Sequence, residues 1–411
     1  MEKHKLIEMG TLSRGKSQHR PRNDLKLYGG KYPFIQTGDV KNSNLYIDKY
    51  SQTYNDFGLK QSKLWPENTL CITIAANIAD TGILSFPACF PDSIIGFTAT
   101  KGKTDVRYVK YCFDLYQKSI QNMSKGSTQD NLSMEKLEQL EFNCPSFDDQ
   151  QKIAAVLSSL DDKIALNNRI NAKLEQMAKR LYDYWFVQFD FPGADGKPYK
   201  SNGGKMVWNE ELKREIPEGW EVKNFGEILI LLKDGTHNPP KRQEKGIPLL
   251  TGTMFGMNFL DYDKATYISE ADYKIIHSQY EPKENDVIIT KIGTLGNVNL
   301  LRKIDIPIAI HCNSALLRFD MALGVYYPFY YCKSDLFKMR VKAIKGQSIQ
   351  EFASLDRISS IKSEVPCVDI INKFDKVVKP IIEKQKSISF ENEKLKEMRD
   401  KLLPLLMNGQ V

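Results

Sequence analysis

Two long stretches of the chain, residues 147–186 and 368–407, constrain the fold most, because each has the pattern of one long amphipathic helix. In both, apolar side chains recur in steps of three and four residues and form a stripe along a charged rod. A helix of about 40 residues is roughly 60 Å long, which is longer than a compact domain is wide. Each stripe therefore needs another long helix as its partner.

The two stretches are copies of each other. Three apolar residues of the first stretch match residues that lie 221 positions later in the second (395 − 174, 398 − 177 and 402 − 181), namely Leu174, Met177 and Leu181 with Leu395, Met398 and Leu402. Plain core packing would explain a single stripe. Two matched stripes favour two helices that pack on each other.

Polar residues interrupt both stripes. Asn167 and Asn171 interrupt the first, and Gln385 and Asn392 interrupt the second. Buried polar residues at such positions fix the register of paired helices at some cost in stability. Pro380 lies inside the second stretch and lacks a backbone donor, so we expect a bend there or a helix that begins after it.

Length and composition exclude several classes of protein. A chain of 411 residues suggests two or three domains. The net charge of +7 and the pI near 8.8 are compatible with a polyanionic partner. The seven cysteines are isolated, which predicts reduced thiols and no structural zinc. Because no apolar run reaches the ~18 residues of a membrane span, we expect a soluble, cytoplasmic protein.

The duplication extends to the segments that precede the helices. Gly15 and Gly235 stand in similar surroundings 220 residues apart (235 − 15), and further matches follow in the same order. Each module alternates short β-rich runs with a helix-like segment, which predicts a mixed α/β fold. The predicted strands are residues 32–36, 70–74, 247–250 and 287–290, and the predicted helices are residues 107–121 and 328–342.

The repeat divides the chain into five predicted parts. These are a first module (1–146), a first long helix (147–187), a linker (188–218), a second module (219–366) and a second long helix (367–411). The predicted fold class is α+β, with two mixed α/β domains, two long helices and an internal repeat.

Polar residues beside the repeated framework differ between the modules, and they are the candidate DNA contacts. Arg and Lys bind guanine and phosphates, Asn and Gln bind adenine, and Ser and Thr are adaptable. A solvated polar loop would explain either set alone. Different polar sets at matching places favour recognition of two different sequences.

The candidate DNA contacts fall into two sets. In the first module they are Arg14, Lys16, Ser17, Gln18, Arg20, Thr37, Lys125, Ser127 and Gln129. In the second module they are Lys233, Thr236, His237, Asn238, Lys241, Arg242, Thr251, Thr253, Lys291, Lys345, Gln347 and Ser348. No catalytic residue and no metal ligand is predicted.

Four stretches together resemble the specificity subunits of type I restriction-modification systems: residues 181–191, 196–209, 215–220 and 402–409. The resemblance covers essentially the whole chain. It implies two target-recognition domains, each of which recognises one half of a bipartite DNA site. It also implies that the long helices pair as an antiparallel coiled coil, relate the domains by a pseudo-two-fold axis, set the spacer between the half-sites and dock modification subunits.

The resemblance also implies partners and cofactors. The expected partners are double-stranded DNA, modification (methyltransferase) subunits and a restriction (translocase and nuclease) subunit, without a membrane. S-adenosylmethionine, ATP and Mg²⁺ are implied for the partner subunits, and we expect none to bind this chain. Because the DNA-facing loops vary within such a family, no base preference can be transferred.

Two other functions are alternatives to recognition of DNA. The sequence Asn238-Pro239-Pro240-Lys241 is similar to the motif of adenine N6-methyltransferases, but lysine replaces the aromatic residue that must stack on the flipped base. No glycine-rich cofactor loop accompanies it. A coiled-coil scaffold that binds only protein would not explain divergent polar loops on duplicated modules.

Overall fold

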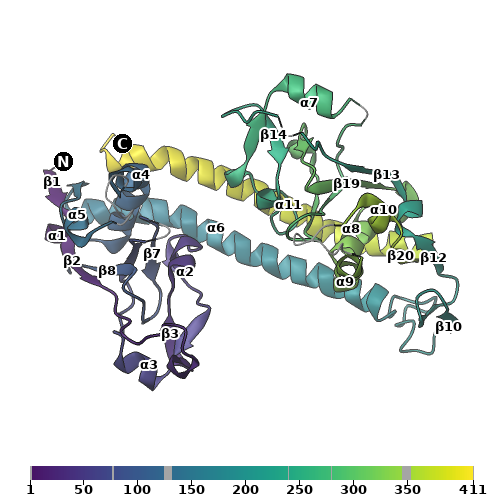
Figure 1. Cartoon of the computed structure of the whole chain (residues 1–411), viewed down its shortest axis with the longest axis horizontal. Coiled ribbons are helices and arrows are strands. Elements are labelled where there is room, and N and C mark those ends of the chain that lie inside the picture. Colours follow the sequence, from purple (N-terminus) through teal and green to yellow (C-terminus); the bar gives the residue numbers. More distant parts are fainter. Residues whose placement is uncertain are drawn as a thin grey trace. The chain divides into compact units, whose positions relative to one another are not determined.

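A computed structural model describes residues 2–75, 78–124, 132–238, 240–278, 280–344 and 353–410 of the chain. The chain forms two compact units (Figure 1). The first consists of Met1–Arg169 and Ile388–Val411, and the second of Ile170–Ser387. Each unit therefore contains one module together with parts of both long helices.

The first unit is built on a sheet with the strand order β2-β8-β6-β7-β4. Its strands are β2 (Gly10–Arg14), β4 (Tyr46–Ile47), β6 (Leu70–Thr73), β7 (Thr81–Leu84) and β8 (Ile94–Ala99). Two smaller antiparallel pairs accompany it: β1 (Glu2–Lys5) with β9 (Glu141–Cys144), and β3 (Tyr28–Phe34) with β5 (Gln52–Tyr54). The helices of this module are α1 (Leu6–Met9), η1 (Leu25–Leu27), α2 (Thr37–Lys41), α3 (Asp56–Lys60), α4 (Val106–Ser124) and α5 (Met134–Glu138).

Strand β6 lies inside this sheet and is covered on both faces. Ile72 belongs to the core that contains Phe113 of α4, whereas the neighbouring Cys71 belongs to the opposite core around Trp65. Successive side chains of a strand point to opposite faces. A continuous apolar run such as Leu70–Thr73 is therefore what a strand between two cores requires.

The second unit repeats this plan. Its main sheet has the order β13-β19-β16-β17, and a smaller sheet has the order β15-β14-β18. The strands are β10 (Met206–Asn209), β11 (Arg214–Pro217), β12 (Glu221–Asn224), β13 (Leu229–Asp234), β14 (Ile247–Leu250), β15 (Thr266–Ile268), β16 (Val287–Thr290), β17 (Val298–Leu300), β18 (Ala309–Ile310), β19 (Ser314–Phe319) and β20 (Lys362–Val365). The helices are η3 (Phe225–Ile228), η4 (Gly252–Met254), η5 (Tyr262–Lys264), α7 (Glu270–Ile276), η6 (Lys303–Asp305), η7 (Met321–Leu323), α8 (Tyr326–Lys333), α9 (Asp335–Ala343) and α10 (Leu355–Ser359).

The repeat extends to the register of the strands. Leu12 pairs with Phe97 in the first unit, and Leu232 pairs with Leu317 in the second. Both partners are shifted by the same 220 positions (232 − 12 and 317 − 97). The duplication seen in the sequence is therefore a duplication of strand pairing, and the mixed helix and sheet composition predicted for the modules is confirmed.

Most predicted elements match the structure. Strands β14 and β16 have the predicted bounds, and β6 ends one residue before the predicted end. Strand β3 begins four residues before the predicted start and ends two residues before the predicted end. The helix predicted over residues 107–121 lies within α4. The single helix predicted over residues 328–342 is wrong, because the Ser334 hydroxyl accepts the N–H of Phe337 (3.1 Å) and starts the separate helix α9.

The two long helices are α6 (Phe147–Tyr182), which continues into the π-helical turn η2 (Asp183–Val187), and α11 (Val368–Met407) (Figure 1). Of the two outcomes expected at Pro380, a helix that begins after this residue is wrong, since α11 runs through it. In the described part of the chain, none of the helices has the length and apolar character needed to span a membrane.

In the first unit the long helices run antiparallel. Asp161 of α6 pairs with Arg399 of α11 (2.9 Å), and further along α6 Asn167 donates from Nδ2 to Oδ1 of Asn392 (2.9 Å). The partner numbers fall along α11 as the numbers rise along α6, which defines the direction. The burial predicted for Asn167 and Asn392 is confirmed.

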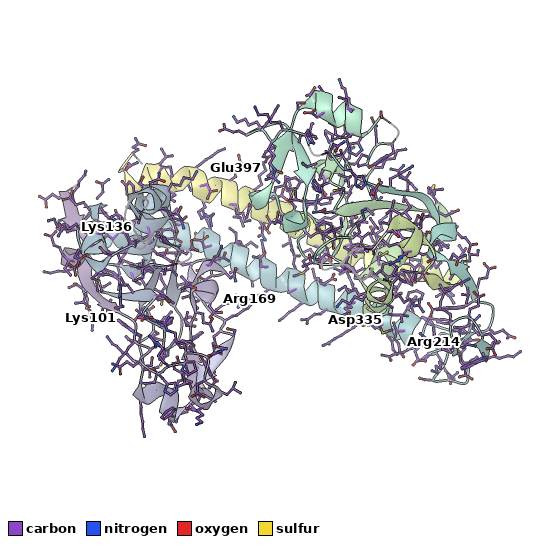
Figure 2. The ribbon with its side chains drawn as sticks, viewed as in Figure 1. Lys101, Lys136, Arg169, Arg214, Asp335 and Glu397 are labelled. Carbon is purple, nitrogen blue, oxygen red and sulfur yellow. The ribbon has the colours of Figure 1, made fainter. Side chains whose placement is uncertain are left out.

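In the second unit, polar contacts attach the same helices to each other and to the module. Gln385, which is buried as predicted, donates from Nε2 to the carbonyl oxygen of Asn171 (3.2 Å). Asp335 of α9, labelled in Figure 2, forms an ion pair with Lys179 of α6 (2.9 Å). The bond with Asn171 links one helix to the other at a defined register.

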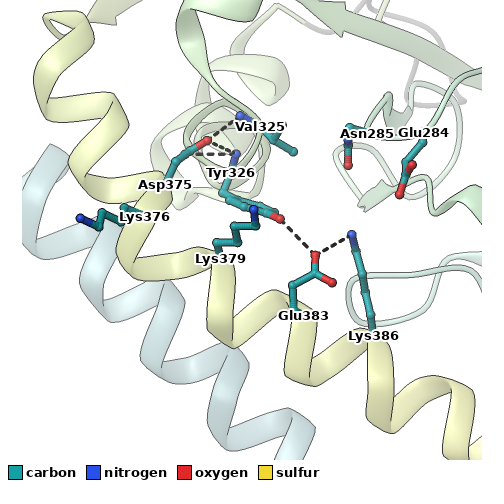
Figure 3. A pocket seen from close by; sticks show the side chains of 9 residues that line it. All are labelled: Glu284, Asn285, Val325, Tyr326, Asp375, Lys376, Lys379, Glu383 and Lys386. Atoms are coloured by element: carbon teal, nitrogen blue, oxygen red, sulfur yellow. Dashed lines mark hydrogen bonds and ion pairs between the residues drawn. The ribbon is translucent and has the colours of Figure 1, made fainter.

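A carboxylate of α11 caps helix α8 in the second unit. Asp375 accepts the backbone N–H groups of Val325 (2.6 Å) and Tyr326 (3.1 Å) beside a pocket of about 420 Å³ (Figure 3). It also accepts the backbone N–H of Tyr327 (2.9 Å). A negative charge at a helix N-terminus is favourable. Gly324 leaves room for it, because a Cβ there would lie 2.3 Å from the Asp375 carboxylate. The cap thus joins α11 to the second module.

Candidate DNA interface

The first candidate loop, residues 15–20, follows strand β2. Its backbone is fixed to the sheet, because the N–H of Gly15 donates to the carbonyl oxygen of Ile94 (2.8 Å) and that of Lys16 to Phe90 (3.1 Å). A Cβ on Gly15 would lie 2.2 Å from the carbonyl oxygen of Pro91, so only glycine fits. The turn therefore lies directly against the backbone at the start of strand β8 and in the segment before it.

Most of the predicted contacts of this loop face solvent. Arg14, Lys16, Gln18 and Arg20 are exposed. Ser17 is buried, at 5 % exposure, so the structure places it inside the loop rather than among the exposed side chains. The exposed set forms a cationic and amide-bearing edge of the first unit.

Gln61, at the end of α3, fastens this loop. Its Oε1 accepts the backbone N–H of Gln18 (2.7 Å) and of His19 (3.0 Å). His19 in turn lies 2.9 Å from Asp24, and the Lys26 N–H together with His19 holds the pKa of Asp24 below its usual range. Sequence analysis missed Gln61 and Asp24, since neither lies beside the repeated glycine.

The second candidate loop, residues 235–242, follows strand β13 and uses the same scaffold. The N–H of Thr236 donates to the carbonyl oxygen of Ile310 (3.0 Å), which corresponds to the bond from Lys16 to Phe90 in the first unit (236 − 16 and 310 − 90 are both 220). A Cβ on Gly235 would lie 1.8 Å from the carbonyl oxygen of Ile310. Both repeated glycines are thus required by a close backbone approach.

The polar residues of the second loop form a different set. The exposed members are Lys233, His237, Asn238, Lys241 and Arg242, and Thr236 is partly buried. Thr251 and Thr253 flank the start of η4 with their hydroxyl oxygens 2.9 Å apart, and Thr37 is the first residue of α2 in the other unit. The predicted contacts Lys125, Ser127, Gln129, Lys345, Gln347 and Ser348 lie outside the described residues.

A charged network lies under the second loop. Oδ2 of Asp234 is 2.9 Å from Nζ of Lys291 and 3.1 Å from Nε2 of His237. Burial tends to raise the pKa of Asp234, but the bonds and charges of Lys291 and His237 outweigh it and lower that pKa. Lys291 is only 2 % exposed, so the structure places this predicted DNA contact in the interior.

His311 lies beside the same loop, and sequence analysis missed it. His311 lies shortly before β19. Burial lowers the pKa of His311, and the positive charges of Arg242 and His237 lower it further. The polar run from His311 to Asn313, directly after an apolar strand, is the signal that could have indicated it. The loop thus combines several cationic groups with one carboxylate, which suits binding of an anion such as DNA.

The chain is similar to known proteins along its length. Residues 1–176 match the family described as the type I restriction modification DNA specificity domain. The type I restriction enzyme MjaIX specificity subunit of Methanocaldococcus jannaschii is 28% identical over 426 aligned residues, which cover 99% of this chain and 92% of that protein. The HindI specificity subunit of Haemophilus influenzae is 24% identical, over 70% of this chain and 72% of that protein.

A solved structure supports the fold. The S subunit of a type I restriction-modification system from M. genitalium has a TM-score of 0.56 and 19% sequence identity, and the match covers 98% of this chain and 95% of that one. The duplicated modules, the long helices and these similarities agree. The chain thus matches the type I restriction modification DNA specificity domain over residues 1–176, and along almost its whole length it is similar to a type I specificity subunit.

Proposed function

We propose that the chain is the DNA-recognition subunit of a type I restriction-modification complex and that each module recognises one half of a bipartite site. The observation that carries this proposal is the pair of loops at residues 15–20 and 235–242. Both begin with the same close backbone approach at a glycine and the same backbone bond just after it, but their exposed side chains differ. Matching loop starts with different polar sets suit two different DNA sequences.

The chain itself performs no catalysis in this proposal. Modification subunits would bring S-adenosylmethionine, and a restriction subunit would bring the ATP and Mg²⁺ chemistry. The purified chain alone is therefore expected to transfer no methyl group to DNA. Methylation by the rigorously purified chain that disappears in Asn238→Ala would contradict this.

Selection of bound sites from a random duplex pool tests the recognition itself, with the full chain assembled with its modification subunits. Replacing Lys16, Gln18 and Arg20 by alanine should reduce or abolish the base preference at one half-site and leave the preference at the other intact. The triple substitution of Thr236, His237 and Lys241 should do the reverse. If both halves blur equally in either variant, the loops contact only the DNA backbone.

The paired helices are proposed to set the distance between the half-sites and to dock the modification subunits. Two half-sites on one face of B-DNA lie about 34 Å apart, and four inserted residues lengthen a helix by roughly 6 Å. Inserting four residues after Asn168, with four between Ser387 and Ile388 to keep the helices paired, should lengthen the unread spacer by about two base pairs or abolish binding. An unchanged spacer at full affinity would refute the helices as the ruler.

A further inference from the structure

Lys291 occupies a junction of the second unit. It follows strand β16, and its backbone N–H donates to the carbonyl oxygen of Asn313 (2.9 Å). Its own carbonyl oxygen accepts the N–H of Ala353 (3.1 Å), which lies shortly after the predicted contacts at residues 345–348. The residue therefore connects the end of strand β16 to the segments that contain Asn313 and Ala353.

The first unit has the same backbone junction around a different side chain. The N–H of Ile74 donates to the carbonyl oxygen of Ser93 (3.0 Å), and its carbonyl oxygen accepts the N–H of Leu132 (3.2 Å). The shifts to the second unit are those of the repeat: 291 − 74 is 217, as for β6 and β16, 313 − 93 is 220, and 353 − 132 is 221. The shared backbone bonds are therefore compatible with a buried isoleucine.

The ammonium group of Lys291 must then be explained by what it binds. An ammonium buried in a protein is costly unless it is paired, and an apolar side chain serves the junction in the first unit. The ammonium binds Asp234 (2.9 Å), whose carboxylate also contacts His237 (3.1 Å). Arg14 stands at the position that matches Asp234 (234 − 14 is 220), so the first unit has a cation where the second has the anion.

We propose that Lys291 is a positioning residue for the second half-site, which holds His237 through Asp234 and does not itself contact DNA. The proposal rests on the proposed function and revises the prediction that Lys291 is a DNA contact. The interior of the second unit thereby determines a base preference at its surface.

The test compares Lys291→Met with Lys233→Met, the same substitution at an exposed lysine of strand β13, beside Asp234. In Lys291→Met, discrimination should fall roughly tenfold at the bases that His237→Ala also affects, since a base contact contributes about tenfold or more. The first half-site and the salt dependence of binding should stay unchanged. Lys233→Met should instead weaken all sequences and reduce the slope of log K against log salt by about 0.9.

A double variant separates positioning from general damage. Lys291→Met added to His237→Ala should cause little further loss of base discrimination if Lys291 acts through His237. Should Lys291→Met unfold the second unit, Lys291→Ile gives the same comparison with the residue that the first unit uses. Unchanged base preference, additive losses, or a reduced salt slope in the Lys291 variant would overturn the proposal. A wild-type chain without a bipartite preference would overturn the proposed function instead.

Discussion

The loops at residues 15–20 and 235–242 start in the same way, but different side chains hold them. In both, a glycine passes under a backbone carbonyl and the following N–H is bonded to the neighbouring segment. The first loop is held by the neutral amide of Gln61, which accepts two backbone N–H groups. In the second loop, His237 contacts the carboxylate of Asp234, which forms an ion pair with the buried Lys291.

The difference shows which parts of a duplicated module are free to diverge. The close backbone approach admits only glycine, so it is retained in both copies. Holding the loop in place requires only a side chain that binds it, and either an amide or a charged pair can do this. Side chains that hold the loop can therefore change together with the side chains that the loop presents.

Substitution of the two glycines that both loops share should have the largest effect. A methyl group in Gly235→Ala would lie 1.8 Å from a carbonyl oxygen, and in Gly15→Ala 2.2 Å. Backbone atoms cannot move aside as a flexible side chain can. Each variant should therefore lower the free energy of unfolding of its own unit by on the order of 3 kcal/mol. Hydrogen exchange resolved by unit would measure this.

Matched controls for these variants exist in both units. A Cβ on Gly38 or Gly252 meets open space, so Gly38→Ala and Gly252→Ala should leave the exchange of their units unchanged. If Gly235→Ala exchanges like Gly252→Ala, the close approach does not constrain the loop.

A smaller effect should separate the two units at their helix caps. Asp375 caps α8 in the second unit, whereas Ala154 stands at the matching position of the first (375 − 221 is 154). Asp375→Ala removes the acceptor for three backbone N–H groups and should cost about 2 kcal/mol. Asp375→Asn, which keeps one carbonyl oxygen, should cost less. Denaturant unfolding monitored in each unit would detect it, and equal losses in both units would contradict it.

The repeat, the long helices and most strands can be predicted from the sequence because they depend on local periodicity and on residues spaced by a constant shift. The exposed loop residues can be predicted as well, since the polar runs follow the repeated glycines directly. The break at Ser334 was missed because a serine that caps one helix within a helical pattern looks like a tolerated polar residue.

The fastening of the loops could not be predicted in the same way. Gln61 lies 43 residues beyond Gln18, and Lys291 lies 57 residues beyond Asp234. Such contacts depend on how strands and loops come together in space, and a single sequence contains no periodicity that marks them. The burial of Lys291 is invisible for the same reason, because lysine is ordinarily a surface residue.

Low pH should destabilise the second unit more than the first, because the second unit contains a buried histidine. Burial lowers the pKa of His277, although Tyr280 and Glu281 act in the opposite direction. Its Nε2 accepts the N–H of Ile310 (3.3 Å), which a protonated ring cannot do. Because the folded pKa lies below the unfolded value, the stabilisation is complete above about pH 6.5 and is lost as the pH falls through the folded pKa.

The second unit should therefore exchange faster at pH 5.5 than at pH 7.5, relative to the first unit. His277→Gln, which cannot gain a proton in this range, should flatten this dependence. His19→Gln in the first unit is the matched control, because His19 is not buried. A pH dependence that survives in His277→Gln would assign it to another group.

Substitution of Gln61 should have the smallest effect, and it tests whether this side chain holds the first loop. Gln61→Ala removes the acceptor for the N–H groups of Gln18 and His19. Since Gln18 is exposed, water can replace part of the bond. The free energy that holds the loop in place should therefore fall by about 1 kcal/mol. That corresponds to a roughly fivefold loss of discrimination at the first half-site, with the second half unchanged. Gln61→Glu keeps an acceptor and should retain the preference. If Gln61→Ala and Gln61→Glu behave alike, the loop is held by its backbone bonds to the sheet, and the two units differ less than their side chains indicate.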